Sequence, residues 1–221
     1  MGTPIVDDLK NAFDVILHPN TYSYKNMSLG EGIIKFYKVM LIPMILLMII
    51  SALFISSIAS SGGLFGSIFG AATIGIVIIS ILIDYIIVIP IGLIISAAVI
   101  QLIAGSLLKW YKGGFGATFG GLIYGIFPSL LLTWLTPIPI LGAIISIIIF
   151  FWVIVVETFA LSKLHNISAM KAFGGLVITG IIIFVIVIII ALILGAALLG
   201  ALLGGLGAGA IHSGAYNTTA I

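Results

Sequence analysis

The sequence predicts an all-α integral membrane protein, a bundle of five transmembrane helices preceded by a short amphipathic helix. The first observation is composition: of 221 residues, 62% are hydrophobic and only 6% are charged, and the mean hydropathy is +1.45. A water-soluble globule needs more polar surface than this, so lipid is expected to be the main solvent. The second observation is that apolar blocks long enough to cross a bilayer alternate with short polar stretches.

The distribution of lysine predicts how the helices cross the membrane. The chain has no arginine, and its eight lysines fall in three stretches, 10–38, 109–112 and 163–171. Lysines close to membrane-spanning helices stay on the cytoplasmic side. The pattern therefore predicts a cytoplasmic N-terminus and, after five spans, an external C-terminus. The net charge of +2 is too small to indicate a nucleic-acid partner, so the expected contact is the lipid bilayer itself.

Residues 1–35 are predicted to form a cytoplasmic segment that contains one amphipathic helix. Thr3-Pro4 is typical of a helix start, and His18-Pro19 of a helix end. Between them, apolar residues recur at helical spacing and form one stripe: Val6, Leu9, Phe13, Ile16 and Leu17. The helix is expected either to pack under the bundle or lie on the inner leaflet, or to present its stripe to a partner.

The membrane domain is predicted over residues 36–210, and its first span over about 37–60, with Pro43 in the first turns. A stretch of about 45 residues, 64–108, follows with Asp84 as its sole charge. As a single helix it would be about 68 Å long, against a hydrocarbon core of about 30 Å. Two crossings would divide the lysines between the two sides of the membrane, whereas one crossing keeps all of them inside.

One crossing at about 76–108 is therefore favoured, and residues 64–73 are then expected at the outer surface. Whether the segment 64–84 is interfacial, re-entrant or part of a long second helix stays open. The remaining spans are predicted at about 117–135, 140–161 and 172–203, followed by an external polar tail, 211–221. The last span would be about 48 Å long, so it is expected to tilt or to protrude past the outer leaflet.

Two acids, Asp84 and Glu157, lie within or beside the predicted spans. A carboxylate inside a membrane is costly, so each is a candidate for an ion path or proton relay. Each also has a structural interpretation. Asp84 would be a polar anchor at the outer interface, and Glu157 would pair with Lys163 or another inner lysine. No second acid stands one helical turn from either, which argues against a carboxylate metal cage within one helix.

Nothing in the sequence predicts an enzyme, a cofactor or a metal site. The three histidines, His18, His165 and His212, lie outside the predicted spans, and none has the spacing of a metal or catalytic motif. A loop histidine of this kind is expected to make hydrogen bonds or to lie at the interface. The chain has no cysteine, which excludes a disulfide, a thiolate metal site and a cysteine nucleophile.

Small residues near the C-terminus indicate a packing surface. They recur every four residues and would form a ridge that permits close helix contact, within the bundle or in a homo-oligomer: Ala196, Gly200, Gly204 and Ala208. The alternative is that this end is simply rich in glycine and flexible. Asn217 begins a glycosylation triplet and is the one such asparagine that the predicted topology places outside.

Short motifs along the chain resemble those of the Yip1 domain family. They are the proline before the first span, in Leu17-His18-Pro19-Asn20, the glycine-rich turn Gly113 to Phe119 with the following Tyr124 and Phe127-Pro128-Ser129, and the connection Leu161, His165, Ile167-Ser168 and Lys171-Ala172. The similarity covers about residues 12–199. It implies five membrane helices with a cytoplasmic N-terminus, and no family residue is established as catalytic.

Eukaryotic members of that family act in vesicle traffic and bind prenylated Rab-type GTPases. The long acidic or proline-rich region before the first span of those members has no counterpart here, so small-GTPase binding rests on family analogy alone. The resemblance implies the cell membrane in a prokaryote, or the Golgi or endoplasmic reticulum in a eukaryote. The expected function is a membrane scaffold or accessory subunit that recognises other membrane components through helix packing and its cytoplasmic loops. The alternatives are a small transporter or channel component using the intramembrane acids, and a membrane-shaping protein.

Overall fold

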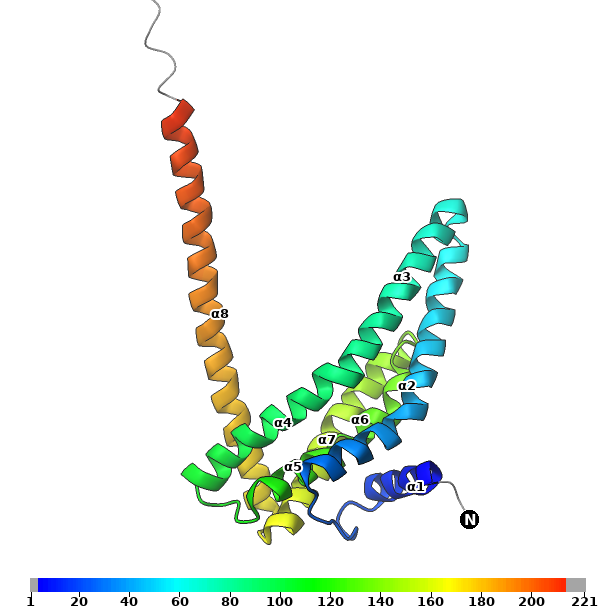
Figure 1. Ribbon diagram of the computed structural model, residues 1–221, viewed down its shortest axis with the longest axis vertical. Helices are drawn as coiled ribbons and strands as arrows, with labels where there is room; N and C mark the ends of the chain where they lie inside the picture. Colours follow the sequence, from blue (N-terminus) through cyan, green and yellow to red (C-terminus); the bar gives the residue numbers. More distant parts are fainter. Residues whose placement is uncertain (1–3, 214–221) are drawn as a thin grey trace, which may run out of the picture. The chain divides into compact units, whose positions relative to one another are not determined.

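The protein is entirely helical in the part of the chain that the structure describes, which confirms the predicted all-α membrane fold (Figure 1). Figure 1 shows the computed structural model, which describes the backbone of residues 4–213 and the side chains of this range other than those at 4, 64–69, 193 and 195–213. Among the described residues, five helices are long and apolar enough to cross a membrane: Leu29–Ser60, Gly70–Leu107, Gly114–Leu135, Leu141–His165 and Ala169–Leu192.

The chain divides into two compact units, Met1–Leu176 and Val177–Ile221. The first unit holds every helix except most of the last one. Large buried side chains of its core come from four helices, α2 (Leu29–Ser60), α5 (Gly114–Gly125), α6 (Phe127–Leu132) and α7 (Leu141–His165). They include Phe36, Phe119, Ile123, Tyr124, Phe127 and Leu161. Helix α5 supplies three of these six, because it is the central element and its residues 117–125 are all buried.

Helix α1, Pro4–Leu17, is the predicted amphipathic helix and ends at the predicted boundary. Its buried face differs from the predicted stripe, because the small residues Ala12 and Val15 are fully buried against the bundle. Leu9 and Ile16 are half-buried beside them. The remaining residues of the predicted stripe, Val6, Phe13 and Leu17, are exposed.

Helix α2, Leu29–Ser60, begins eight residues before the predicted span. The reason is a capping box: the Ser28 hydroxyl accepts the Glu31 N–H, and the Glu31 carboxylate accepts the Ser28 N–H at 2.8 Å. This early start corrects the position of Pro43, which lies in the interior of the helix and not in its first turns.

The following stretch forms one uninterrupted helical rod of four segments, α3 (Gly63–Ile83), η1 (Asp84–Val88), α4 (Ile89–Ile100) and η2 (Gln101–Leu107). It contains no turn between Gly63 and Leu107, so the alternative with two crossings has no place for a reversal. The segment 64–84 belongs to a long second helix, because nothing in its apolar sequence interrupts the backbone hydrogen bonds. Helices α2 and α3 lie side by side and run in opposite directions (Figure 1).

The segments η1 and η2 are π-helical, and Pro90 explains the first. In an α-helix the Ile86 carbonyl would accept the N–H of residue 90, but proline has none. The backbone widens instead, so that the Ile89 N–H donates to the Asp84 carbonyl. The free Ile86 carbonyl accepts the Tyr37 hydroxyl of α2 at 2.8 Å. A proline thus fixes a contact between two helices.

The next three segments form the centre of the bundle. Helix α5, Gly114–Gly125, continues after a kink at Ile126 into α6, Phe127–Leu132, and the 3₁₀ turn η3, Thr133–Leu135. Pro128 in the first turn of α6 has no N–H to continue the ladder, which accounts for the kink. Helix α7, Leu141–His165, ends at Asn166, whose φ of 53° is the left-handed cap that asparagine tolerates.

Helix α8, Ala169–Ser213, has 45 residues and extends ten residues past the predicted end of the last span at 203. It contains no proline and its alanine and leucine residues favour helix, so the glycines after Gly195 do not end it. His212 therefore lies within the helix and not in a polar tail.

The segment 18–28, which we call the strap, joins α1 to α2 and lies across α5. Two glycines of α5 make the close approach possible, since a side chain at Gly116 would come within 3.1 Å of the Met27 carbonyl and one at Gly120 within 3.5 Å of the Met27 nitrogen. Tyr22 and Tyr24 of the strap pack edge-on against Tyr124 of α5, with ring centroids 5.8 and 5.0 Å away. Burial raises the pKa of Tyr22 to about 12, so this phenol stays neutral at physiological pH.

Candidate functional site

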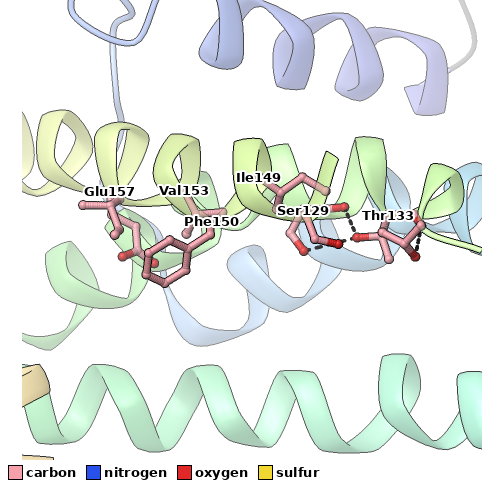
Figure 2. Close-up of a pocket in the computed structure, with 9 residues that line it drawn as sticks. Ser129, Thr133, Ile149, Phe150, Val153 and Glu157 are labelled. Atoms are coloured by element: carbon pink, nitrogen blue, oxygen red, sulfur yellow. Dashed lines mark hydrogen bonds between the residues drawn. The ribbon is translucent and has the colours of Figure 1, made fainter. Parts of the chain in front are cut away.

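A groove with a volume of about 570 Å³ opens between the α6–η3 segment and α7 (Figure 2). The groove has both polar and apolar lining residues, and it lies between two helices that are long and apolar enough to span a membrane. Its polar lining consists of four hydroxyl side chains and one acid, Ser129, Thr133, Thr136, Ser146 and Glu157. Figure 2 shows Glu157 at one end of the groove and Ser129 with Thr133 at the other. We call this cavity the groove.

Each of the four hydroxyl groups in the groove donates its proton in a hydrogen bond to another atom of the protein. Thr133 donates to the Ser129 carbonyl, Thr136 to the Thr133 carbonyl at 2.7 Å, and Ser146 to the Gly142 carbonyl at 2.8 Å. Because Thr133 has already donated its proton, Ser129 is the donor in the 3.3 Å hydroxyl pair that they form. Hydroxyls that have donated retain lone pairs, so the groove offers acceptors and not donors.

Glu157 adds a carboxyl group to this lining. Its side chain packs on Gly125 of α5, where a Cβ atom would overlap the Glu157 Cγ. The described part of the chain contains two ion pairs, Lys38–Asp8 and His18–Asp14, and neither involves Glu157. The pairing with Lys163 that its sequence position suggested is therefore not among the contacts of the described residues.

The structure does not bring the second candidate acid to the groove. Asp84 is exposed at the start of η1, and it does not line the cavity. Its neighbour Tyr85 is buried and interacts with the Thr133 side chain. The long second helix therefore contacts the groove wall through a tyrosine and not through the acid.

A second polar cluster surrounds His165, which is buried at the end of α7 with 1% of its surface exposed. Its Nδ1 accepts the Gly113 N–H at 2.8 Å, so in a neutral ring the proton is on Nε2, which lies 3.1 Å from the Thr118 hydroxyl. Thr118 in turn donates to Gln101 Oε1 of η2 at 2.6 Å. The cluster links η2, α5 and α7.

Tyr111 connects the same cluster to the start of α8. Its ring stacks on His165 at 4.5 Å between centroids, and its hydroxyl donates to the Ala172 carbonyl at 2.6 Å. Every polar atom named here has a partner, which indicates a structural role for His165. The expected loop position is wrong, because His165 is the last residue of α7 and is buried, but the residue does make the expected hydrogen bonds.

The other candidate residues lie apart from the groove. His18 is exposed and bonds Asp14 one turn earlier at 3.0 Å. The small residues Ala196, Gly200, Gly204 and Ala208 have a helical backbone within α8, but their side-chain surroundings lie outside the described part. Asn217 also lies outside the described residues.

Sequence reasoning missed the hydroxyl residues of the groove, yet a signal for them was present. Ser129 and Thr133 stand four residues apart, as do Gly142 and Ser146, and an otherwise apolar span gives each such hydroxyl only the preceding turn as a partner. Their convergence on Glu157 depends on how α6 packs against α7, which no local pattern encodes.

Replacing His165 by alanine is expected to lower the free energy of unfolding by about 1–3 kcal/mol, because the Gly113 N–H and the Thr118 hydroxyl lose a buried partner. Reversible unfolding in mixed micelles measures the change. His18→Ala is the matched control, since its exposed pair with Asp14 is expected to contribute less than about 1 kcal/mol. Equal effects of the two variants would contradict a structural role for the buried cluster.

Comparisons with protein-family models, with curated proteins and with solved structures gave no match.

Proposed function

We propose that this protein is a small transporter or channel component that binds a monovalent cation or an ammonium group in the groove. The observation that carries the proposal is the set of committed hydroxyl protons beside Glu157. A site made of oxygen lone pairs and a carboxylate is complementary to a cation or an N–H donor, and it repels anions. The groove holds one carboxylate, so a single positive charge matches it best.

The position of the groove supports transport over purely structural roles. Glu157 lies within a helix long and apolar enough to cross a membrane, and a carboxylate in such a position is retained at a cost. The broken geometry of α6 and η3 beside it resembles the interrupted helices that expose backbone to ions in membrane transporters. The lysine clusters support the N-terminus-inside orientation, with the C-terminus outside.

Ion binding is tested by the melting temperature of the purified protein in Na⁺, K⁺ or methylammonium, against N-methylglucamine at the same ionic strength. A bound ion is expected to raise the melting temperature in proportion to ln(1 + [L]/Kd). Glu157→Gln is expected to abolish the rise, because it removes the carboxylate while keeping its shape. Asp84→Asn is the control, since this exposed acid does not line the groove.

Transport itself is measured as cation uptake into proteoliposomes. Glu157→Gln is expected to lower uptake by at least about tenfold, equivalent to 1.4 kcal/mol, and Asp84→Asn to leave it unchanged. Ser146→Ala removes one acceptor without touching the acid and is expected to give an intermediate loss. If all three variants retained the ion response of the native protein, the groove would not be the binding site.

A second candidate function is a membrane scaffold or accessory subunit of the Yip1 type. It is supported by the apolar surface that the first unit leaves exposed, since few side chains of the span Gly70–Leu107 are buried. On α2 and α3 the exposed residues include Leu53, Ile58, Ile76 and Ile79. Gentle purification with native lipid, followed by identification of co-purifying proteins, tests this role. Recovery of the chain alone, without a partner or a second copy, would count against it.

A further inference from the structure

Four exposed lysines gather where two connections between membrane-spanning helices meet. We call them the basic patch: Lys109, Lys112, Lys163 and Lys171. Each stands two residues from an end of a candidate span, and these ends are Leu107, Gly114, His165 and Ala169. Two crossings separate the connection 108–113 from the connection 166–168, so both connections lie on the same side of a membrane.

Two hydrogen bonds hold the segments of the basic patch together. The Gly113 N–H donates to His165 Nδ1 at 2.8 Å, which fixes the loop after Lys112 against the end of α7. The Tyr111 hydroxyl donates to the Ala172 carbonyl at 2.6 Å, which fixes the same loop against the first turn of α8. Tyr111 and His165 are both buried. The exposed lysines are therefore mounted on buried contacts and not on free loops.

One lysine of the basic patch has a strained backbone. Lys109 has a φ of 56°, in the left-handed region that is unfavourable for a residue with a Cβ atom. This turn directs the N–H groups of Trp110 and Tyr111 back to the Ala104 carbonyl, at 2.8 and 3.1 Å. Glycine would make the same turn without strain, as Gly114 does at a φ of 73°. A lysine at a position that favours glycine indicates a use for its charge.

The charge of the basic patch is not balanced by acids of the same segments. Residues 101–120 and 158–176 contain no aspartate or glutamate. The six acids of the chain lie outside these segments: Asp7, Asp8, Asp14, Glu31, Asp84 and Glu157. Both ion pairs in the described part of the chain use acids of α1, and neither includes a lysine of the patch. The patch therefore presents positive charge alone.

We infer that the basic patch binds the phosphate groups of anionic lipids. Exposed apolar side chains stand beside the lysines, since Leu107 is 69% and Met170 78% exposed. A soluble polyanion would neutralise the lysines but leave these side chains in water. A bilayer interface offers hydrocarbon to the apolar side chains and phosphate to the ammonium groups. Trp110, half-buried three residues past the span end, is of the type enriched at this depth.

The chain has no native cysteine, so a single label can report the lipid beside the basic patch. The full chain with Met170→Cys is labelled with the environment-sensitive dye NBD and placed in phosphatidylcholine vesicles. These contain an equal, small fraction of either phosphatidylglycerol or phosphatidylcholine with a doxyl quencher near the headgroup. Position 170 is expected to be quenched more strongly by the phosphatidylglycerol. Ile144→Cys is the control, exposed near the opposite end of α7 and expected to be quenched equally by both.

Removing single lysines tests whether the basic patch causes this preference. Lys112→Gln and Lys163→Gln are each expected to lower the ratio of the two quenching constants at position 170. The expected loss is up to about fivefold for each, which corresponds to about 1 kcal/mol per lysine at an anionic surface. Lys10→Gln removes the same charge from α1 and is expected to leave the ratio unchanged.

The charge and the strain of Lys109 can be tested separately. Lys109→Gln removes the charge and keeps the left-handed conformation, whereas Lys109→Gly removes both. Both variants are expected to lower the preference for phosphatidylglycerol equally, and only Lys109→Gly to raise the melting temperature. Equal quenching by the two lipids at position 170 would overturn the inference. Absence of quenching by either lipid there would also overturn it, because a protein would then cover the patch.

Discussion

Replacing Tyr124 by alanine is expected to lower the free energy of unfolding by about 3–5 kcal/mol, the range for removing a buried aromatic side chain. The ring is 2% exposed and joins two parts of the first unit. Tyr22 and Tyr24 of the strap pack on it, and the Lys35 ammonium of α2 lies 4.5 Å from its centroid. Its loss leaves a cavity that no single neighbour can fill.

The paired variant Tyr124→Phe separates the ring from the hydroxyl. The hydroxyl accepts the Lys25 N–H at 3.3 Å, a contact expected to contribute about 0.5–1.5 kcal/mol. Unfolding in mixed micelles gives both free energies, and limited proteolysis at Lys25 reports whether the strap is released. Phe151→Ala, at a 61% exposed position, is the control for aromatic truncation. A Tyr124→Ala effect no larger than that of Phe151→Ala would contradict the role of the ring.

Replacing Gly142 by alanine is expected to destabilise the protein by about 3 kcal/mol, at the upper end of the cost of overpacking. A Cβ atom at this position would overlap the Thr136 carbonyl oxygen, which belongs to the backbone and has no rotamer to change. The Gly142 N–H also donates to the Ile138 carbonyl at 2.6 Å, so the turn has little room to open. Thr136 lines the groove, and its displacement is expected to weaken ion binding as well.

The control is Gly92→Ala in α4, where an added Cβ atom meets nothing within 4 Å. There the alanine is expected to stabilise the helix by about 0.5–1 kcal/mol, because glycine is the poorer helix former. The two glycine-to-alanine changes should therefore have opposite signs in the same unfolding measurement. Stabilisation by both would show that the turn at Thr136 relaxes without cost.

The fold could be predicted because its signals are local. Hydropathy over a window of residues locates the five apolar helices, and His18-Pro19 predicts the end of α1 at Leu17 to within a residue. The start of α2 was also within reach, since Ser28 and Glu31 form a capping box in the sequence itself. The predicted start at about residue 37 is wrong because the first turns of α2 precede the apolar run.

The contacts of the candidate site could not be predicted, because they join distant parts of the chain. Gln101, Thr118 and His165 meet across three helical segments, and no spacing in the sequence relates them. The groove needs the kink at Ile126 as well as the packing of α6 on α7. Glu157 was identified because a charge in an apolar span stands out, whereas its hydroxyl neighbours are common in membrane helices.

Because of its two π-helical segments, the contacts of the second helix depend on the number of residues between them. Each π turn holds one residue more than an α turn, which rotates everything beyond it by about 100°. Tyr85 meets α6–η3 and Gln101 meets Thr118 only because the residue count between them matches this rotation. Substitutions between these two positions, other than at Pro90, leave the residue count intact, but the deletion of a single residue would turn Gln101 away from Thr118. Over evolutionary time, this helix should therefore accept changes of residue far more readily than insertions or deletions.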